Sequence, residues 1–321
     1  MFAAEMANDC GIGYWEPNSR VVHAVSTRGP TGPFERAEVV VSPFAHEPNA
    51  VRAPDGSWVI YFTMRHPPGE LYNCTGGMPR ARPHYRGGGD SGAQERAPES
   101  RHTYMTHSPS PHGPWATPVL VLKANTSIWD KHKALIDTNL AVVINEDGSV
   151  LGLWRLCENE PKGTICETQC CTFLHSLRAS DWRDPRTYLP DSSARIFPQN
   201  KPFGAEDPML WAQTHHPRGG PSQPRMVVHA IVHDEQGDSR ETAIGRHAFS
   251  DDGGLTWTYA QEDAYNGTVG WEGGGGVTLW RRERPHMVVD SAGVPIAVSN
   301  GVQESRDDDR SYTLVQPLVG S

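Results

Sequence analysis

The sequence predicts an all-β fold, a five-bladed β-propeller, and three observations lead to this prediction. Apolar residues occur in short runs separated by turn residues, and helical periodicity is nearly absent along the 321 residues. The 32 glycines and 27 prolines are spread along the chain, which is typical of many tight turns. Two sequence units, which we call the head and the tail, recur several times. Repeated β units that each leave their faces uncovered indicate a propeller.

The head consists of a polar or acidic start, an apolar strand, a tight turn and a second apolar strand. Its four copies start at His46-Glu47-Pro48, Asp137-Thr138-Asn139, Glu206-Asp207-Pro208 and Glu283-Arg284-Pro285. The copies follow one another at intervals of roughly 70 to 90 residues, which suits four-stranded blades with their loops. We expect each head to begin with the innermost strand of a blade.

The tail is a hairpin with a serine, a glycine and an aromatic residue. Its copies lie at residues 26–34, 108–115, 180–182 and 250–257. The last copy, Ser250-Asp-Asp-Gly-Gly-Leu-Thr-Trp257, fits the Asp-box pattern of sialidase-like propellers. We assign it a structural role, in which the Asp side chain holds the turn and the Trp packs between blades.

About five blades fit into the chain, so we expect a single domain over residues 1–321. A Gly-, Pro- and Arg-rich stretch at 66–102 lengthens the first interval between heads, and it predicts a flexible surface loop. The first tail precedes the first head, so residues 1–6 and 21–25 should be the second and third strands of a blade. Two explanations for its innermost strand stay open: residues 312–317 close the ring, or one strand has been lost.

Composition excludes several classes of function. The net charge of −9 and the pI near 5.9 argue against a nucleic-acid or anionic-membrane partner. No run of apolar residues is long enough to cross a membrane. Six cysteines and three glycosylation sequons, at Asn73, Asn125 and Asn266, predict a secreted or otherwise extracytoplasmic location. Since the chain has no signal peptide, we expect its start to be trimmed or incomplete; the cysteine pairing stays open.

The starts of the heads converge in a propeller, because the innermost strands line one central channel. The ring expected at its mouth consists of His46, Glu47, Asp137, Glu206, Asp207, Glu283 and Arg284. An acid at nearly every position exceeds what the turns need. Carboxylates gathered beside arginines acquire different pKa values, and acid and base roles can then separate.

These motifs resemble five-bladed glycoside hydrolases of families 43, 32 and 117, which include arabinanases, xylosidases and invertases. A poorly characterised family-43-like group is also similar in its motifs at 45–48, 206–208, 281–285 and 299–302. The resemblance implies a two-carboxylate mechanism in which Glu47 is base or nucleophile, Glu206 is the general acid and Asp137 positions Glu206. Glu47 replaces the usual Asp, and Asp137 is not followed by Pro. If the missing strand belongs to the first blade, each role shifts by one blade.

The other candidate residues would bind substrate. They are His46, Trp154, Arg155, Asp207, His229, His247, Arg282, Glu283 and Arg284. Arginine forks suit hydroxyl, uronate or sulfate groups, and a Trp face suits a sugar ring, although packing between blades is the favoured explanation of the Trp residues. His229 and His233 share one side of a strand without an evident third ligand, so we expect no metal and no cofactor.

The expected partner is a plant, algal or microbial oligo- or polysaccharide substrate, which the chain would hydrolyse. One alternative is a non-catalytic carbohydrate-binding propeller, which would lack a paired acid and base. A second is a polysaccharide lyase that uses His46, His229 or His247 as its base. A sialidase is less favoured, because one Asp-box is only a marker of fold. The sugar, the linkage, the stereochemistry and the oligomeric state stay open.

Overall fold

The computed structural model describes residues 1–66, 69–77, 100–123, 139–158, 171–191, 196, 205–215, 225–234, 244–290 and 293–318. Asp137 therefore lies outside the described residues. Of the loop expected at 66–102, residues 69–77 lie against the first blade, where the backbone N–H of Cys74 donates to the carbonyl of Asn8 (3.0 Å). Most of the rest of that loop is outside the described ranges.

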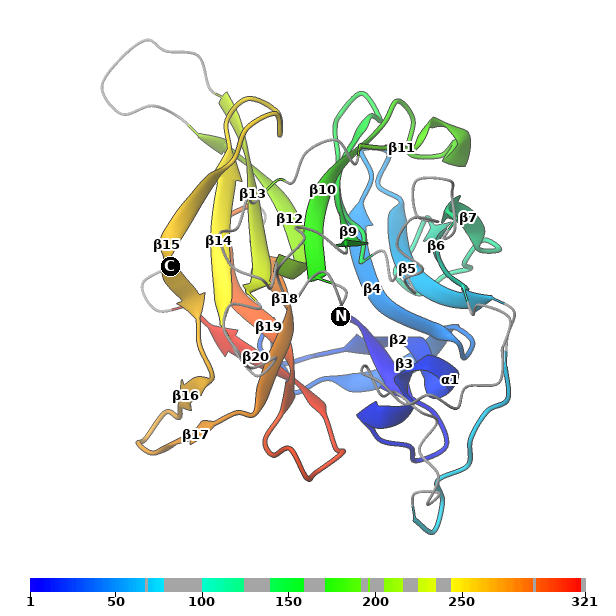
Figure 1. The fold of residues 1–321 in the computed structure, drawn as a ribbon, viewed down its shortest axis with the longest axis vertical. Helices are drawn as coiled ribbons and strands as arrows, with labels where there is room; N and C mark the ends of the chain where they lie inside the picture. The colour runs from blue at the N-terminus through cyan, green and yellow to red at the C-terminus, as the bar shows by residue number, and fades with distance from the viewer. Residues whose placement is uncertain are drawn as a thin grey trace.

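The chain forms a five-bladed β-propeller of antiparallel sheets, as the repeats predict (Figure 1). The first two blades consist of β1 (Phe2–Met6), β2 (Ser19–Val25) and β3 (Glu35–Val41), then β4 (Ala45–Arg52), β5 (Trp58–His66), β6 (Ser100–Ser108) and β7 (Val119–Leu122). Blade 3 consists of β8 (Ala141–Ile144), β9 (Val150–Glu158), β10 (Cys171–Ala179) and β11 (Leu189–Pro190). Blade 4 contains β12 (Ala205–His215), β13 (Arg225–Asp234), β14 (Gly245–Ser250) and β15 (Thr258–Tyr265). Blade 5 contains β18 (Arg281–Val289), β19 (Pro295–Gln303) and β20 (Tyr312–Pro317).

Short elements connect these strands. They are η1 (Ile12–Tyr14) and α1 (Trp15–Asn18) between β1 and β2, η3 (Pro185–Thr187) before β11, and the hairpin of β16 (Thr268–Gly270) and β17 (Gly276–Thr278) before blade 5. Among the residues that the structure describes, no helix is both long and apolar enough to span a membrane.

The heads form the innermost strands, as expected. The copies that start at 46, 206 and 283 lie in β4, β12 and β18, and the copy at 137 leads into β8. Each of these strands occupies the end of its sheet and pairs with the next strand along the chain. Between β4 and β5, the turn contains Gly56 at φ 86°, which glycine adopts without the steric cost of a Cβ. The Asp55 carboxylate accepts the N–H of Ser57 (3.0 Å) in the same turn.

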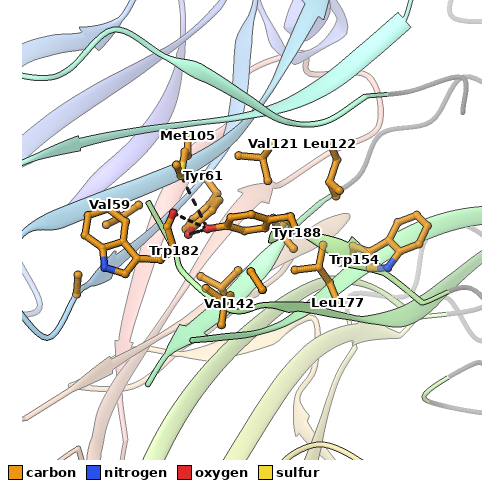
Figure 2. Packing of buried hydrophobic residues seen from close by; sticks show 14 of the residues in the cluster. Val59, Tyr61, Met105, Val121, Leu122, Val142, Trp154, Leu177, Trp182 and Tyr188 are labelled. Atoms are coloured by element: carbon orange, nitrogen blue, oxygen red, sulfur yellow. Dashed lines mark hydrogen bonds between the residues drawn. The ribbon is translucent and has the colours of Figure 1, made fainter. Parts of the chain in front are cut away.

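The hydrophobic core lies between neighbouring blades rather than inside any one of them. The largest cluster joins blades 2 and 3 and includes Tyr61, Met105, Trp154, Trp182 and Tyr188 (Figure 2). Apolar residues of blades 3 and 4 form the next cluster, and those of blades 1 and 2 another. A blade alone therefore exposes its apolar faces, and packing around the ring removes them from water.

The tail of blade 4 is held by one carboxylate. Asp252 accepts hydrogen bonds from the hydroxyl of Ser250 (2.7 Å), the N–H of Leu255 (2.9 Å) and the N–H of Thr256 (3.0 Å). Trp257, at the end of this tail, packs against the cluster that joins blades 3 and 4. Both contacts are structural and lie in the turn between β14 and β15.

Blade 1 contains three described strands, and its tail lies between β2 and β3. In blade 2 the tail lies between the third and fourth strands, so β1 and β2 correspond to second and third strands, as predicted. The C-terminal strand does not close the ring here: β20 pairs with β19 as the third strand of blade 5. A cavity of about 600 Å³ lies between β1 and blade 5, lined by β1, β4, β18, β19 and β20.

Candidate active site

Four residues occupy equivalent places at the starts of the innermost strands, and all four have a left-handed backbone. They are Glu47 (φ 56°), Asn139 (φ 34°), Asp207 (φ 51°) and Arg284 (φ 54°). The strand register shifts beside three of them, between His46 and Asn49, Glu206 and Met209, and Glu283 and His286. A bulge with positive φ at a non-glycine residue costs free energy, and such strain is concentrated at functional sites. This repeated bulge is the geometric basis of the site.

Side chains from these bulges contact one another, although they come from four blades. The guanidinium of Arg284 forms ion pairs with Glu47 and with Asp207, the latter at 3.3 Å. The backbone N–H of Arg284 also donates to Asp207 (3.1 Å). On the other side Asn139 donates its amide N–H to the Asp207 carboxylate. The four bulges therefore converge on one end of the central channel.

Asp207 is ionised at the centre of this network. Burial by itself would raise the pKa of Asp207, because a charged group loses its hydration. Electrostatic interactions with Arg284, His233 and Arg155, together with the hydrogen bond from Asn139, outweigh burial and hold the pKa of Asp207 below its ordinary value. An ionised carboxylate with this many partners is suited to orienting its neighbours.

Glu206 precedes this bulge and has partners of its own. Arg155, from β9 of blade 3, forms an ion pair with one carboxylate oxygen of Glu206. His233, from β13, lies opposite Glu206 in the strand register, and its Nδ1 is 3.3 Å from the other oxygen. The Glu206 side chain is 13% exposed, so solvent reaches it only in part. Glu206 therefore lies at the channel end with one arginine and one histidine fixing its orientation.

His46 and Glu283 also lie at this end, beside the bulges of their strands. The Nδ1 of His46 is 2.6 Å from the hydroxyl of Ser19, and its ring lies 4.8 Å from that of Trp15. The Glu283 carboxylate is 3.8 Å from the guanidinium of Arg281. Both residues line the cavity beside β1.

Two of the expected binding residues lie elsewhere. Trp154 has no exposed surface and packs between blades 2 and 3, where its indole N–H donates to the carbonyl of Ser176 (3.0 Å). Arg282 is 1% exposed and donates to Asn300 and Gln316 within blade 5. In a regular strand residues 282 and 284 would face the same side, but the register shift between Glu283 and His286 and the positive φ of Arg284 interrupt this alternation, so Arg284 alone of the two reaches Glu47 and Asp207. Neither Trp154 nor Arg282 is part of the channel-end cluster.

His229 and His247 form an aromatic row on blade 4. The ring of His229 stacks on Trp211 at 5.0 Å, and its Nδ1 lies 3.1 Å from the Nε2 of His247. Burial, with His247 and His215 nearby, lowers the pKa of His229 to about 4, and burial also lowers the pKa of His247. Both rings are therefore neutral at neutral pH. Their partners in this row are aromatic side chains rather than the carboxylates at the channel end.

Sequence reasoning did not identify Asn139 and His233 as site residues. Asn139 occupies the bulge position of blade 3, but Leu140 rather than Pro follows it. Because Asp137 is the acidic residue of this head, Asp137 was predicted as the site residue instead. The signal for His233 was its spacing from His229 on one face of a strand, which indicated that one of them faces the channel. The ligand atoms of Glu206, Asp207 and His233 lie within 4.8 Å of one another, so these residues could also hold a cation.

The fold is shared with solved structures of carbohydrate-active enzymes. A xylan β-1,4-xylosidase from Bacillus halodurans C-125 has a TM-score of 0.53 at 10% identity, covering 98% of this chain and 50% of that chain. The catalytic domain of the GH62 α-L-arabinofuranosidase of Coprinopsis cinerea has a TM-score of 0.53 at 9% identity, covering 98% and 86%. The chain thus spans half the length of the xylosidase.

A scan against protein-family models finds no match, and a search of curated proteins finds none either. At identities near 10% the likeness to the two solved structures is one of fold, and the chemistry has to be argued from the site.

Proposed function

We propose that this chain is a glycoside hydrolase that cleaves a plant, algal or microbial oligo- or polysaccharide at the channel end. The observation that carries the proposal is the pair of carboxylates Glu47 and Glu206, which come from different blades and contact different arginines. Two carboxylates with separate surroundings are the general requirement for glycoside hydrolysis. The fold of the xylosidase and the arabinofuranosidase supports this class of reaction and suggests glycosides of plant polysaccharides as first substrates to test.

Glu47 takes the role of base or nucleophile. Its side chain is only 4% exposed and contacts the guanidinium of Arg284, which favours the ionised carboxylate. A base or nucleophile has to be ionised before the reaction, so this contact suits the role. The hydroxyl of Thr63 donates a hydrogen bond to the second carboxylate oxygen of Glu47 (3.5 Å).

Glu206 takes the role of general acid. Its contact with Arg155 favours the ionised form, so Arg155 has to transfer its hydrogen bonds to the substrate before Glu206 can hold a proton. This exchange gives Arg155 the substrate-binding role expected from the sequence. His233 stays on the other oxygen and keeps Glu206 in place. We retain Asp137, outside the described residues, as the candidate for positioning Glu206.

A carbohydrate-binding propeller without catalysis is the second candidate. It is favoured by one specific observation: Glu47, Glu206 and Asp207 each contact an arginine at the described channel end. A site of ion-paired carboxylates orients sugar hydroxyls without needing a protonated acid.

The test measures sugar release from aryl glycosides and from polysaccharides by the wild type, Glu47→Gln and Glu206→Gln. Loss of general acid catalysis should slow cleavage of unactivated glycosides about 10²- to 10⁴-fold, while aryl glycosides with good leaving groups are cleaved nearly as before. Glu47→Gln should abolish both activities. Glu262→Gln, an exposed carboxamide substitution on β15, is the matched control and should leave both unchanged.

Binding of a polysaccharide without release of sugar by the wild type would favour the carbohydrate-binding candidate. Release of sugar that neither variant alters would contradict the assignment of Glu47 and Glu206. If Arg155→Gln raised activity on unactivated glycosides, the exchange of partners proposed for Arg155 would be wrong.

A further inference from the structure

A second group of chemically reactive side chains lies at the junction of blades 1 and 2, and one of its members, His23, lines the cavity that also reaches Glu47 and Arg284. It consists of His23 from β2, Glu38 from β3 and His112 from the turn between β6 and β7. The ligand atoms of the three residues lie within 4.8 Å of one another. They occupy sequence positions 23, 38 and 112, so no short ligand-spacing motif marks the site.

Backbone pairing brings two of these residues together. His23 and Glu38 are opposite one another in the register of β2 and β3, so their side chains leave the same face of the sheet. The ring of His23 is stacked on Phe2 at 4.7 Å, and this contact fixes its orientation. The ring centroid of His112 lies 4.9 Å from that of His23. The tail of blade 2 thus delivers His112 to a pair already in place.

The separations suit one metal ion. The Nδ1 atoms of His23 and His112 lie 3.2 Å and 3.8 Å from the same oxygen of Glu38. Zinc binds imidazole nitrogen and carboxylate oxygen at about 2.0–2.2 Å, and a tetrahedral arrangement then places neighbouring ligand atoms about 3.4 Å apart. These two separations lie on either side of this value. Small rotations of the exposed His112 side chain would equalise them.

The charges at this junction act in both directions: Glu38 favours a cation, and the N-terminal ammonium of Met1 near His23 opposes one. The ion-pair partners of Glu38 within the described ranges are these two histidines, while the nearby Arg36 pairs with Glu5. A neutral imidazole is the form that binds metals, so a bound ion would displace any proton from the metal-facing nitrogens of the two histidines. Two imidazoles and one carboxylate form a ligand set typical of zinc.

We propose that His23, Glu38 and His112 bind one divalent metal ion of the zinc type between blades 1 and 2, with water at the fourth position. The ion would link the sheet of blade 1 to the tail of blade 2. Because binding favours the folded state, it would also stabilise the junction of the two blades. The proposal is independent of any activity at the channel end.

The test titrates the chelator-treated full chain with ZnCl₂ by calorimetry and follows the thermal midpoint in parallel. We expect one strong site and a higher midpoint with zinc. His112→Ala and Glu38→Gln should each weaken binding at least about tenfold and remove the shift in the midpoint. The His112 side chain is largely exposed, so its removal should leave the fold intact. His107→Ala, an exposed histidine on β6, is the matched control.

Three results would overturn the proposal. The first is the absence of zinc binding by the wild type. The second is binding of several ions that all variants share equally, which indicates unspecific sites. The third is a single site that His112→Ala leaves unchanged and His233→Ala removes, which would place the ion at Glu206, Asp207 and His233 instead.

Discussion

Arg284 of blade 5 contacts Glu47 of blade 2 across the end of the central channel, and the same guanidinium contacts Asp207 of blade 4. One cation therefore serves two nearly buried carboxylates from two other blades. All three residues have the left-handed backbone of the repeated bulge. The bulge therefore determines which side chains reach the channel, and their charges join blades 2, 4 and 5.

Replacing Arg284 should destabilise the protein more than its partial exposure suggests. Arg284→Met leaves Glu47 and Asp207 close together without a cation, and breaking such a pair by removing one partner costs about 3–5 kcal/mol when the charges are buried. The Arg284 side chain is 30% exposed, so we expect the lower part of this range, about 3 kcal/mol. Urea unfolding measures the effect. Arg281→Met on the same strand is the control, with a change within about 0.5 kcal/mol; a similar small change for Arg284→Met would contradict the prediction.

Asp207 should make stability depend on pH in the acidic range. Its pKa in the folded state lies below the ordinary value, so its stabilising contribution is present above about pH 4 and is lost as pH falls through the folded-state pKa. The free energy of unfolding should therefore fall more steeply below about pH 4 in the wild type than in Asp207→Asn, by up to about 1.4 kcal/mol per pH unit. Parallel curves for the two proteins would show that Asp207 does not cause this dependence. The exposed substitution Asp307→Asn should follow the wild type.

The propeller could be predicted from sequence because its repeating features are local. A turn such as Asp55-Gly56 needs a glycine with positive φ, and the tail at 250–257 needs Asp252 to accept the N–H groups of its turn. These requirements leave a readable pattern in every repeat. No such sequence pattern marks the strand with which β20 pairs. The place of β20 depends on which free strand edge the C-terminal segment pairs with, and that is decided by tertiary packing.

The channel-end site could be predicted only in part. The starts of the heads predicted that Glu47, Asp207 and Arg284 lie near one another, and their ion pairs show this proximity, while their roles stay predictions. Sequence could not distinguish Arg284 from Arg282, because residues two apart in a regular strand share a face, and the bulge that separates these two side chains is a backbone property. It also missed Asn139, since the bulge geometry that makes it equivalent to Asp207 is a backbone property.

The hydrogen bond between Tyr61 and Tyr188 should contribute unequally through its two partners. The hydroxyls lie 2.6 Å apart in the core between blades 2 and 3, and burial raises the pKa of both, so both stay neutral (Figure 2). Tyr188 also donates to the carbonyl of Trp182 (3.0 Å). Tyr188→Phe therefore leaves two buried groups without this partner and should cost about 2–3 kcal/mol, whereas Tyr61→Phe should cost about 1 kcal/mol.

Denaturant unfolding of the two single variants and of the double variant measures this difference. The double variant should cost less than the two single changes added together, because both remove the same bond. Additive costs would indicate that the bond between the two hydroxyls carries little of the stability of this junction, and a larger loss for Tyr61→Phe than for Tyr188→Phe would contradict the predicted inequality.

The disulfide between Cys10 and Cys74 should stabilise the junction of blades 1 and 2. It joins the turn after β1 to the segment after β5, with a sequence separation of 64 and a distance of 5.0 Å between the two Cα atoms. Closing a loop of this length in the unfolded chain corresponds to about 4 kcal/mol of stability in the chain-entropy description. The double substitution Cys10→Ser and Cys74→Ser should lower the free energy of unfolding by about that amount, measured in urea under oxidising conditions.

The segment after β5 also has bonds that do not depend on sulfur, and these limit the expected loss. Asn8 and Asn18 both donate side-chain N–H groups to the carbonyl of Tyr72, at 3.0 Å and 2.8 Å. If they hold the segment by themselves, the double variant would lose less than about 1 kcal/mol, and the entropic prediction would be wrong. Asn18→Ala in the double variant separates the two contributions. It should cost more there than in the wild type, because the disulfide no longer keeps Tyr72 beside blade 1 when the amide contact is lost.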